Sequence, residues 1–411
     1  TVSKILELVQ SAGGAKAPVE NFITKFARYY TPAVVFAALA LAVIPPLVLP
    51  GAAFSDWLGR ALVFLVVSCP CALVISIPLS FFGGIGGASR SGILIKGSNY
   101  LDALHDVETV VFDKTGTLTR GVFSVTEVCP ADGISREELL ELAAHAESSS
   151  NHPIALSIQK EYGKPISGET LTGYEEIAGH GVRVHVAGRE VLAGNGKLLD
   201  TRGVQRPATD ALGTVVYLAA DGAFAGYLVI SDTVKPDSAR AISELRAVGV
   251  GHTAMLTGDS ISVGEKIGRE LGIDTVCSEL LPHQKVEKLE ELDKARPGKG
   301  RLVFVGDGIN DAPVLARADI GIAMGGVGSD AAIEAADVVL MTDEPSKIAD
   351  AIRIAKKTRA IVWQNIAFAL GVKGVILVLG AIGMATMWAA VFGDVGVALI
   401  AVLNAMRAMR V

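Results

Sequence analysis

The chain has 411 residues, of which 50% are hydrophobic and only 19% are charged, and its formal net charge is −6. Soluble domains carry about 25% charged residues, so this composition indicates a membrane protein. No block of basic residues stands out, which argues against a nucleic-acid partner. Four cysteines are too few for a disulfide framework, and two of them flank one proline, which suggests metal or redox chemistry.

Two uncharged segments come first in chain order. Residues 31–54 and 61–89 contain no charged side chain, and each is long enough to cross a hydrocarbon core of about 30 Å. We therefore expect a transmembrane hairpin over residues 31–89. The stretch before it, residues 1–30, is amphipathic and is predicted to be a linker.

The second of these segments contains the sequence SCPC. Pro70 removes a helix hydrogen bond and clashes with the preceding turn, so the helix is expected to open there. Unwound backbone inside a membrane is tolerated where it lines a site. Cys69 and Cys71 can then face one cavity, although two cysteines alone in apolar helices are more often packing groups. A disulfide between them would close a small, strained ring, so metal or redox chemistry is the better interpretation of the pair.

The middle of the chain, from about residue 100 to 355, has the pattern of an α/β protein. Runs such as VETVVFD, TAMLTGD and LVFVGD end in acidic residues, and helical stretches lie between them. This alternation predicts a doubly wound parallel sheet with ligands at the carboxyl ends of its strands. Residues 120–231 interrupt the pattern and are predicted to be an inserted α+β domain. Residues 90–119 and 232–355 then form the parallel-sheet domain.

Three strand ends carry the groups that phosphoryl transfer needs. Asp113 opens DKTGTLT directly after a strand, where its carboxylate can attack phosphorus without a general base. TGD and GDGINDAP follow two later strands, and their side chains can bind phosphate or Mg²⁺. The predicted partners of Asp113 are phosphate-binding groups, charge-neutralising groups and magnesium ligands: Lys114, Thr257, Lys285, Asp307 and Asp311.

The carboxyl-terminal part, residues 356–411, is predicted to be a second transmembrane hairpin with a tight turn around residues 382–390. The chain then has four spans. Lysines and arginines lie at the same end of every span, and the positive-inside rule makes that end cytosolic. These residues are Lys25, Arg28, Arg90, Lys96, Lys356, Lys357, Arg359, Arg407 and Arg410.

Lys373 and Asp394 are ionisable groups within the second hairpin. Such groups are costly in a bilayer and are by default functional and paired. Two thiolates and one carboxylate carry three negative charges, which a divalent ion and one ammonium balance. Zn²⁺ accepts sulfur and oxygen ligands together, and thiolates also suit Cd²⁺ or Pb²⁺. Lys373 is expected to pair with Asp394 once the metal has left, whereas Met384 and Met387 keep a copper-type site as an alternative.

The three motifs DKTGTLT, TGD and GDGINDAP together resemble those of P-type ATPases, whose phosphorylation domain has the haloacid-dehalogenase fold. CPC in one helix, lysine in the next-to-last and aspartate in the last resemble the zinc, cadmium and lead exporters of the heavy-metal (type IB) branch. The resemblance implies that Asp113 becomes an aspartyl phosphate. It implies catalytic roles for Asp113, Lys114, Thr115, Thr257, Gly258, Asp259, Lys285 and Asn310, and Mg²⁺ binding by Asp113, Thr115, Asp307 and Asp311.

The inserted domain resembles the nucleotide-binding domain of the same family, through SSSNHPIA, GHGV and AGN. The resemblance implies that Glu147 and His152 contact the adenine of ATP. It implies that Gly179 and Gly181 let the nucleotide approach closely, with Asn195 as a further candidate.

The resemblance covers nearly all of this chain but not all of a pump. No TGE motif of an actuator domain is present, since SGET at residues 167–170 has another order. We therefore expect the carboxyl-terminal part of an ATP-driven exporter in a bacterial inner membrane. Its partners are the lipid bilayer, ATP, the metal ion, and the missing actuator domain and amino-terminal helices. The alternatives are a pump-derived module that binds nucleotide and metal without transport, and a copper-type pump.

Overall fold

The computed structural model describes residues 18–150, 152–166, 171–177, 179–207, 209, 213–296, 298–307, 311–325, 330–384 and 386–410. The chain divides into two compact units. The first comprises Thr1–Val111, Arg240–Thr253 and Val286–Val411, and the second comprises Phe112–Ala239 and Ala254–Lys285.

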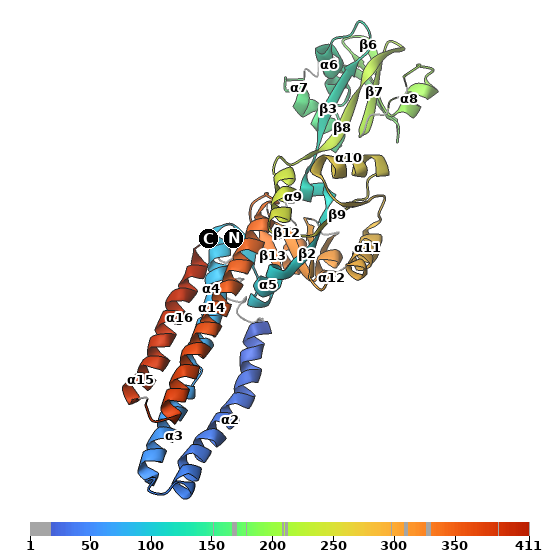
Figure 1. The fold of residues 1–411 in the computed structure, drawn as a ribbon. Helices are drawn as coiled ribbons and strands as arrows, with labels where there is room; N and C mark the ends of the chain where they lie inside the picture. The colour runs from blue at the N-terminus through green and yellow to red at the C-terminus, as the bar shows by residue number, and fades with distance from the viewer. Residues whose placement is uncertain are drawn as a thin grey trace. The chain divides into compact units, whose positions relative to one another are not determined.

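Long apolar helices make up much of the first unit (Figure 1). Within the residues that the structure describes, four stretches are long and apolar enough to cross a membrane, which confirms the four predicted spans: Arg28–Val48, Phe54–Arg90, Lys347–Gly380 and Phe392–Met409. The helices are α2 (Pro18–Val48), α3 (Phe54–Ser68), α4 (Cys71–Arg90), α14 (Lys347–Ala381), α15 (Met387–Val391), the π-helix η6 (Phe392–Gly396), α16 (Val397–Ala405) and the 3₁₀-helix η7 (Met406–Met409).

Helix α4 packs against α14, α16 and η7, and α3 packs against α2 and α14. Small residues permit the close approach of α4 to α14. A Cβ atom on Gly84 would lie only 2.4 Å from Oγ1 of Thr358, so a larger residue cannot be accommodated without movement. The outer faces carry exposed apolar side chains such as Phe36, Leu47 and Leu399, which suit a lipid environment.

The α/β part of the first unit contains parallel strands with buried apolar residues on both faces, as covered parallel sheets require. Strand β11 pairs with β12 and β12 with β13 in parallel, whereas β1 pairs with β13 antiparallel, and β2 lies beside β11. Strands β2 and β9 continue from the first unit into the second. The elements are β1 (Ile93–Ile95), α5 (Ser98–Ala103), η2 (Leu104–Asp106), β2 (Val107–Asp113), α9 (Ser238–Ala247), β9 (His252–Leu256), α11 (Pro282–Ala295), β11 (Arg301–Gly306), α12 (Ala312–Arg317), β12 (Ile320–Met324), α13 (Asp330–Ala335) and β13 (Val338–Leu340).

The second unit contains an antiparallel sheet of six strands in the order β3-β8-β7-β6-β5-β4. Leu139, Ile158 and Leu218 lie in the core formed by this sheet with α6 and α7. Strand β10 pairs with β9 in parallel. The elements are η3 (Lys114–Leu118), β3 (Thr119–Pro130), α6 (Arg136–Ala146), α7 (Pro153–Tyr162), β4 (Leu171–Ile177), β5 (Gly181–Val186), β6 (Arg189–Gly194), α8 (Gly196–Thr201), β7 (Thr214–Ala220), β8 (Ala223–Val234), α10 (Ile261–Leu271) and β10 (Thr275–Cys277).

Candidate functional site

Asp113 stands at the end of β2, at the start of the loop that carries the DKTGTLT motif. The residue is only 4% exposed, and its Oδ1 accepts a hydrogen bond of 2.5 Å from the ammonium group of Lys285. A buried carboxylate requires such a partner. The two residues are 172 positions apart, so the fold brings together the predicted nucleophile and the predicted charge-neutralising lysine.

Lys114, the next residue, forms an ion pair of 2.5 Å with Asp259 of the TGD motif. Two further hydrogen bonds hold the same motif. The backbone amide of Thr257 donates to the carbonyl of Cys277, and the Oγ1 of Thr257 accepts from the backbone amide of Asp259. A Cβ atom at Gly258 would lie 3.3 Å from the carbonyl oxygen of Leu280, so the strand end is tightly packed. Thr115 is exposed beside this cluster.

The remaining predicted magnesium ligands lie in the first unit. Asp307 directly follows β11, and Asp311 is 3% exposed at the start of α12. A Cβ atom on Gly306 would lie 2.9 Å from Cβ of Asp311, which explains why glycine ends this strand. The predicted magnesium ligands come from both units, so their joint binding of Mg²⁺ stays a prediction. Asn310, a predicted catalytic residue, lies outside the described residues.

Glu147 follows α6 and is only 8% exposed. Burial, with a smaller contribution from the negative charge of Glu176, raises the pKa of the Glu147 carboxyl group from 4.5 to about 7. Near neutral pH this group therefore exists in both protonation states. Glu176 lies in β4 and was not among the predicted site residues. Its role became visible only because the fold brings its charge near Glu147.

The other predicted nucleotide-binding residues are held by local turns. Gly181 has φ +140°, and a Cβ atom there would lie 2.2 Å from the carbonyl oxygen of Ala193, so glycine is required. Open space surrounds the Cβ position of Gly179, and its carbonyl accepts a 2.9 Å hydrogen bond from Asn195. The structure thus joins Asn195 to the GHGV turn. His152 caps α7 through its ring nitrogen, which accepts the amide of Ile154.

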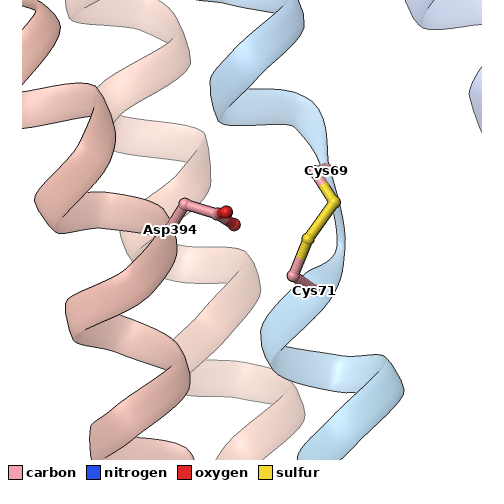
Figure 2. A group of neighbouring side chains, drawn as sticks. All are labelled: Cys69, Cys71 and Asp394. Carbon is pink, nitrogen blue, oxygen red and sulfur yellow. A yellow bond between two sulfur atoms is a disulfide. The ribbon is translucent and has the colours of Figure 1, made fainter.

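The membrane-spanning part contains a second cluster, built around the break at Pro70. Helix α3 ends at Ser68 and α4 begins at Cys71, which confirms the predicted opening of the helix. Ligand atoms of Cys69, Cys71 and Asp394 lie within 4.8 Å of one another. Figure 2 shows the Asp394 side chain pointing from its own helix toward the two cysteines. Asp394 lies in η6, and such π-helical turns occur frequently at functional sites.

Lys373 of α14 is 3% exposed and closes this cluster. Its ammonium group lies 3.1 Å from Oδ1 of Asp394 and donates to the backbone carbonyls of Val67 and Cys69. The expected pairing with Asp394 is therefore present. The two carbonyl acceptors were not predicted; they are available because the helix is interrupted next to them.

Cys69 and Cys71 form a disulfide in this structure, although ring strain was expected to disfavour it (Figure 2). The two Cα atoms lie 5.4 Å apart, which is within the usual range for a disulfide. Side chains two positions apart point to nearly opposite sides of a regular helix, and the break between α3 and α4 removes that restraint. Metal binding by these sulfur atoms therefore requires their reduced form.

A further polar group was not singled out from the sequence. Asn365 of α14 is 1% exposed, donates to the carbonyl of Ala401 and accepts from Asn404. An amide in an apolar span is the signal that could have identified it. It joins α14 to α16 on the cytosolic side that the lysine and arginine pattern predicts.

Comparison with known proteins places these features in a family context. The haloacid dehalogenase-like hydrolase family matches residues 107–319. The chain is 61% identical, over 100% of its length, to the cadmium, zinc and cobalt-transporting ATPase of Bacillus subtilis, of which it covers 58%. It is 58% identical, over 99% of its length, to the zinc-transporting ATPase of Synechocystis, of which it covers 56%. The chain thus spans less than two thirds of either relative.

The fold is also similar to a solved structure. A zinc-transporting PIB-type ATPase in the E2.Pi state superimposes with a TM-score of 0.84 at 38% sequence identity. The match covers 100% of this chain and 67% of that one. This similarity, together with the family match, confirms the predicted combination of membrane helices with a haloacid-dehalogenase-like α/β part.

Proposed function

Because this chain belongs to the heavy-metal P-type ATPases, we propose that the whole protein exports a soft divalent ion, Zn²⁺, Cd²⁺ or Pb²⁺, at the expense of ATP. The chain supplies the catalytic, nucleotide-binding and metal-binding parts. The actuator domain and further amino-terminal helices belong to the rest of the protein. The proposed location is the bacterial inner membrane, with the soluble parts in the cytosol.

The observation that carries the proposal is the membrane cluster itself. Two sulfur ligands, the Asp394 carboxylate and the buried Lys373 ammonium group lie together among the apolar membrane-spanning helices. In its reduced form this set is electrically balanced by one divalent ion, and mixed sulfur and oxygen ligation suits Zn²⁺ and its softer congeners. Cu⁺ would leave a net negative charge. Met384, 71% exposed near the hairpin end, also gives no support to a copper site.

Lys373 has two roles in this proposal. When the ion is bound, its positive charge helps to balance the three negative ligands. When the ion has left, the Lys373 ammonium group contacts Asp394 and the two backbone carbonyls, as in the present structure. A resident ammonium group thus competes with the ion for the same carboxylate, which favours release and disfavours return.

Asp113 is the proposed nucleophile. Its carboxylate attacks the γ-phosphorus of ATP and forms the aspartyl phosphate, while ADP leaves. Lys285 holds Oδ1 in place and offsets negative charge on the transferred group, and Lys114, tied to Asp259, supplies a second positive charge. Thr257 and Gly258 complete the predicted phosphate-binding edge. Asn310 belongs to the same proposed catalytic set.

Asp113, Thr115, Asp307 and Asp311 are the residues proposed to hold Mg²⁺. Their oxygen atoms are of the type this ion prefers, and the low exposure of Asp113 and Asp311 suits carboxylates that share a cation. Bound Mg²⁺ would supply charge neutralisation for the phosphates. Glu147, His152, Gly179, Gly181 and Asn195 are proposed to bind the nucleotide, with adenine beside Glu147.

The proposed domain division follows from these roles. Residues 31–89 and 356–411 are the transmembrane hairpins, and residues 1–30 are the linker. Residues 90–119 and 232–355 form the phosphorylation domain. Residues 120–231, which contain most of the six-stranded sheet, form the nucleotide-binding domain.

The test is ATP hydrolysis by the full-length protein, in reducing buffer, with a panel of Zn²⁺, Cd²⁺, Pb²⁺, Co²⁺ and Cu⁺. Stimulation by the divalent ions and its loss in Asp394→Asn are expected, because the amide removes one negative ligand charge. Exposed Asp132→Asn is the matched control. Stimulation by Cu⁺ alone, or undiminished Zn²⁺ stimulation in Asp394→Asn, would contradict the proposal.

A further inference from the structure

The end of β8 and the residues that lead into α9, from Asp232 to Ser238, hold the phosphorylation loop by several buried hydrogen bonds. The ammonium group of Lys235 donates to the carbonyl of Gly116 at 2.6 Å. The backbone amide of Lys235 and the hydroxyl of Ser238 both donate to the carbonyl of Leu118, at 2.9 and 2.7 Å. Lys235 is 3% exposed and Ser238 is fully buried. These bonds fix the carbonyl groups on the inside of the loop.

The loop needs external support because its backbone is irregular. Gly116 has φ +74°, and Thr115 has φ −75° and ψ +128°, so regular helical hydrogen bonding is interrupted between Lys114 and Leu118. A loop of this kind is held by whatever binds its carbonyl groups. Lys235 binds the carbonyl of Gly116 itself.

Asp232 acts on the same loop through charge. Its side chain is only 8% exposed, accepts a hydrogen bond from the hydroxyl of Thr119, and lies 4.0 Å from the ammonium group of Lys114. The second carboxylate oxygen, Oδ1, is buried and has no hydrogen-bond partner in the described part of the chain. Asp232 is one of the residues that line a cavity of about 640 Å³, together with Lys114, Thr115 and Asp259.

Lys114 is therefore near two carboxylates, Asp259 and Asp232, which differ in their exposure to water. Asp259 is closer, at 2.5 Å, but its side chain is 35% exposed, so water screens part of that interaction. Asp232 is farther away but buried, where screening is weaker. When Asp259 engages another group during the reaction, Asp232 still balances the charge of Lys114.

We propose that Asp232 and Lys235 are positioning residues for phosphoryl transfer. Asp232 holds the ammonium group of Lys114 at the reacting edge, and Lys235 holds the loop through Gly116. Neither residue touches the transferred group. The inference rests on the proposed function, because these residues can position the loop for phosphoryl transfer only if Asp113 is phosphorylated.

The test compares variants of the full-length protein in single-turnover labelling with γ-labelled ATP. Asp232→Asn keeps the shape and the acceptor for Thr119 but removes the charge. We expect its labelling rate at saturating ATP to fall at least about tenfold, a loss typical of a displaced catalytic group, with the Kd for ATP unchanged.

Lys235 is tested in the same assay by Lys235→Met and Lys235→Arg. Loss of rate in the first and recovery of most of it in the second are expected, since a guanidinium group can still donate to Gly116. Exposed Asp132→Asn is the control for a loss of charge in the same unit.

Three results would overturn the positioning proposal: labelling of Asp232→Asn at the unaltered rate, an equal loss in the control Asp132→Asn, or a parallel loss of ATP binding that indicates damage to the fold. Asp232→Glu retains the charge and should keep more activity than Asp232→Asn. Absence of labelling in the unaltered protein would instead refute the proposed function, so the two failures are distinguishable.

Discussion

Replacement of Glu147 by glutamine tests whether burial of this carboxyl group governs the stability of the six-stranded part. Its pKa of about 7, against 4.5 for an ordinary glutamate, means that the folded state binds this proton more tightly than the unfolded state. The contribution of this one group to stability is therefore greatest below pH 4.5 and is lost as the pH rises through 7. A shift of this size corresponds to about 3 kcal/mol in total, of which about 2 kcal/mol is lost between pH 5.5 and pH 8.

Hydrogen–deuterium exchange of the α6 and β5 amides measures the opening free energy of this region in the whole chain. After correction for intrinsic exchange rates, protection should fall about thirtyfold from pH 5.5 to pH 8 in the unaltered protein. Glu147→Gln should remove that dependence, because the amide does not ionise. Exposed Glu141→Gln, on the same helix, is the matched control and should retain it.

The comparison isolates Glu147, since every histidine of the region is present in all three proteins. An equal pH dependence in Glu147→Gln and the unaltered protein would refute the assignment of the raised pKa to this carboxyl group.

Three further perturbations have clear expected outcomes. Asp113→Asn should abolish acid-stable labelling from γ-labelled ATP, because an amide cannot attack phosphorus; a label that persists on another residue counts against the assignment. Reduction of Cys69 and Cys71 should be required for Zn²⁺ binding by the chain, measured by metal analysis after gel filtration; binding by the oxidised protein would show that these sulfur atoms are not ligands. Gly84→Ala should lower stability by about 1–3 kcal/mol in thermal unfolding, because its methyl group meets α14. Gly86→Ala, with open space at its Cβ position, is the control, and an equal effect would refute the packing argument.

Local features of the chain were predictable because their physical causes are contiguous in sequence. The four spans follow from uninterrupted apolar length, and the break in the second span follows from the missing amide of Pro70. The α/β character of the middle follows from alternating buried strands and helices. The catalytic motifs are short, contiguous runs of residues, so DKTGTLT is recognisable from its order of residues alone.

Contacts between distant residues required the tertiary structure. Lys285 and Asp113 are 172 positions apart, and Lys373 and the carbonyl of Cys69 are 304 positions apart. The sequence left open whether Lys373 reaches the sulfur atoms or only Asp394, and the structure shows Asp394 with two backbone carbonyls. Such carbonyls carry no sequence signal, because every residue has one.

The sequence by itself therefore determined which chemical groups are present and which segments lie in the membrane, because composition and short motifs record both. The tertiary structure decided which groups meet. It joined Cys69 to Cys71 across the break between α3 and α4, where ring strain was expected to disfavour a disulfide. It also placed Asp232 beside Lys114, a pairing that depends on the return of the chain through β8 to the loop where the six-stranded sheet begins.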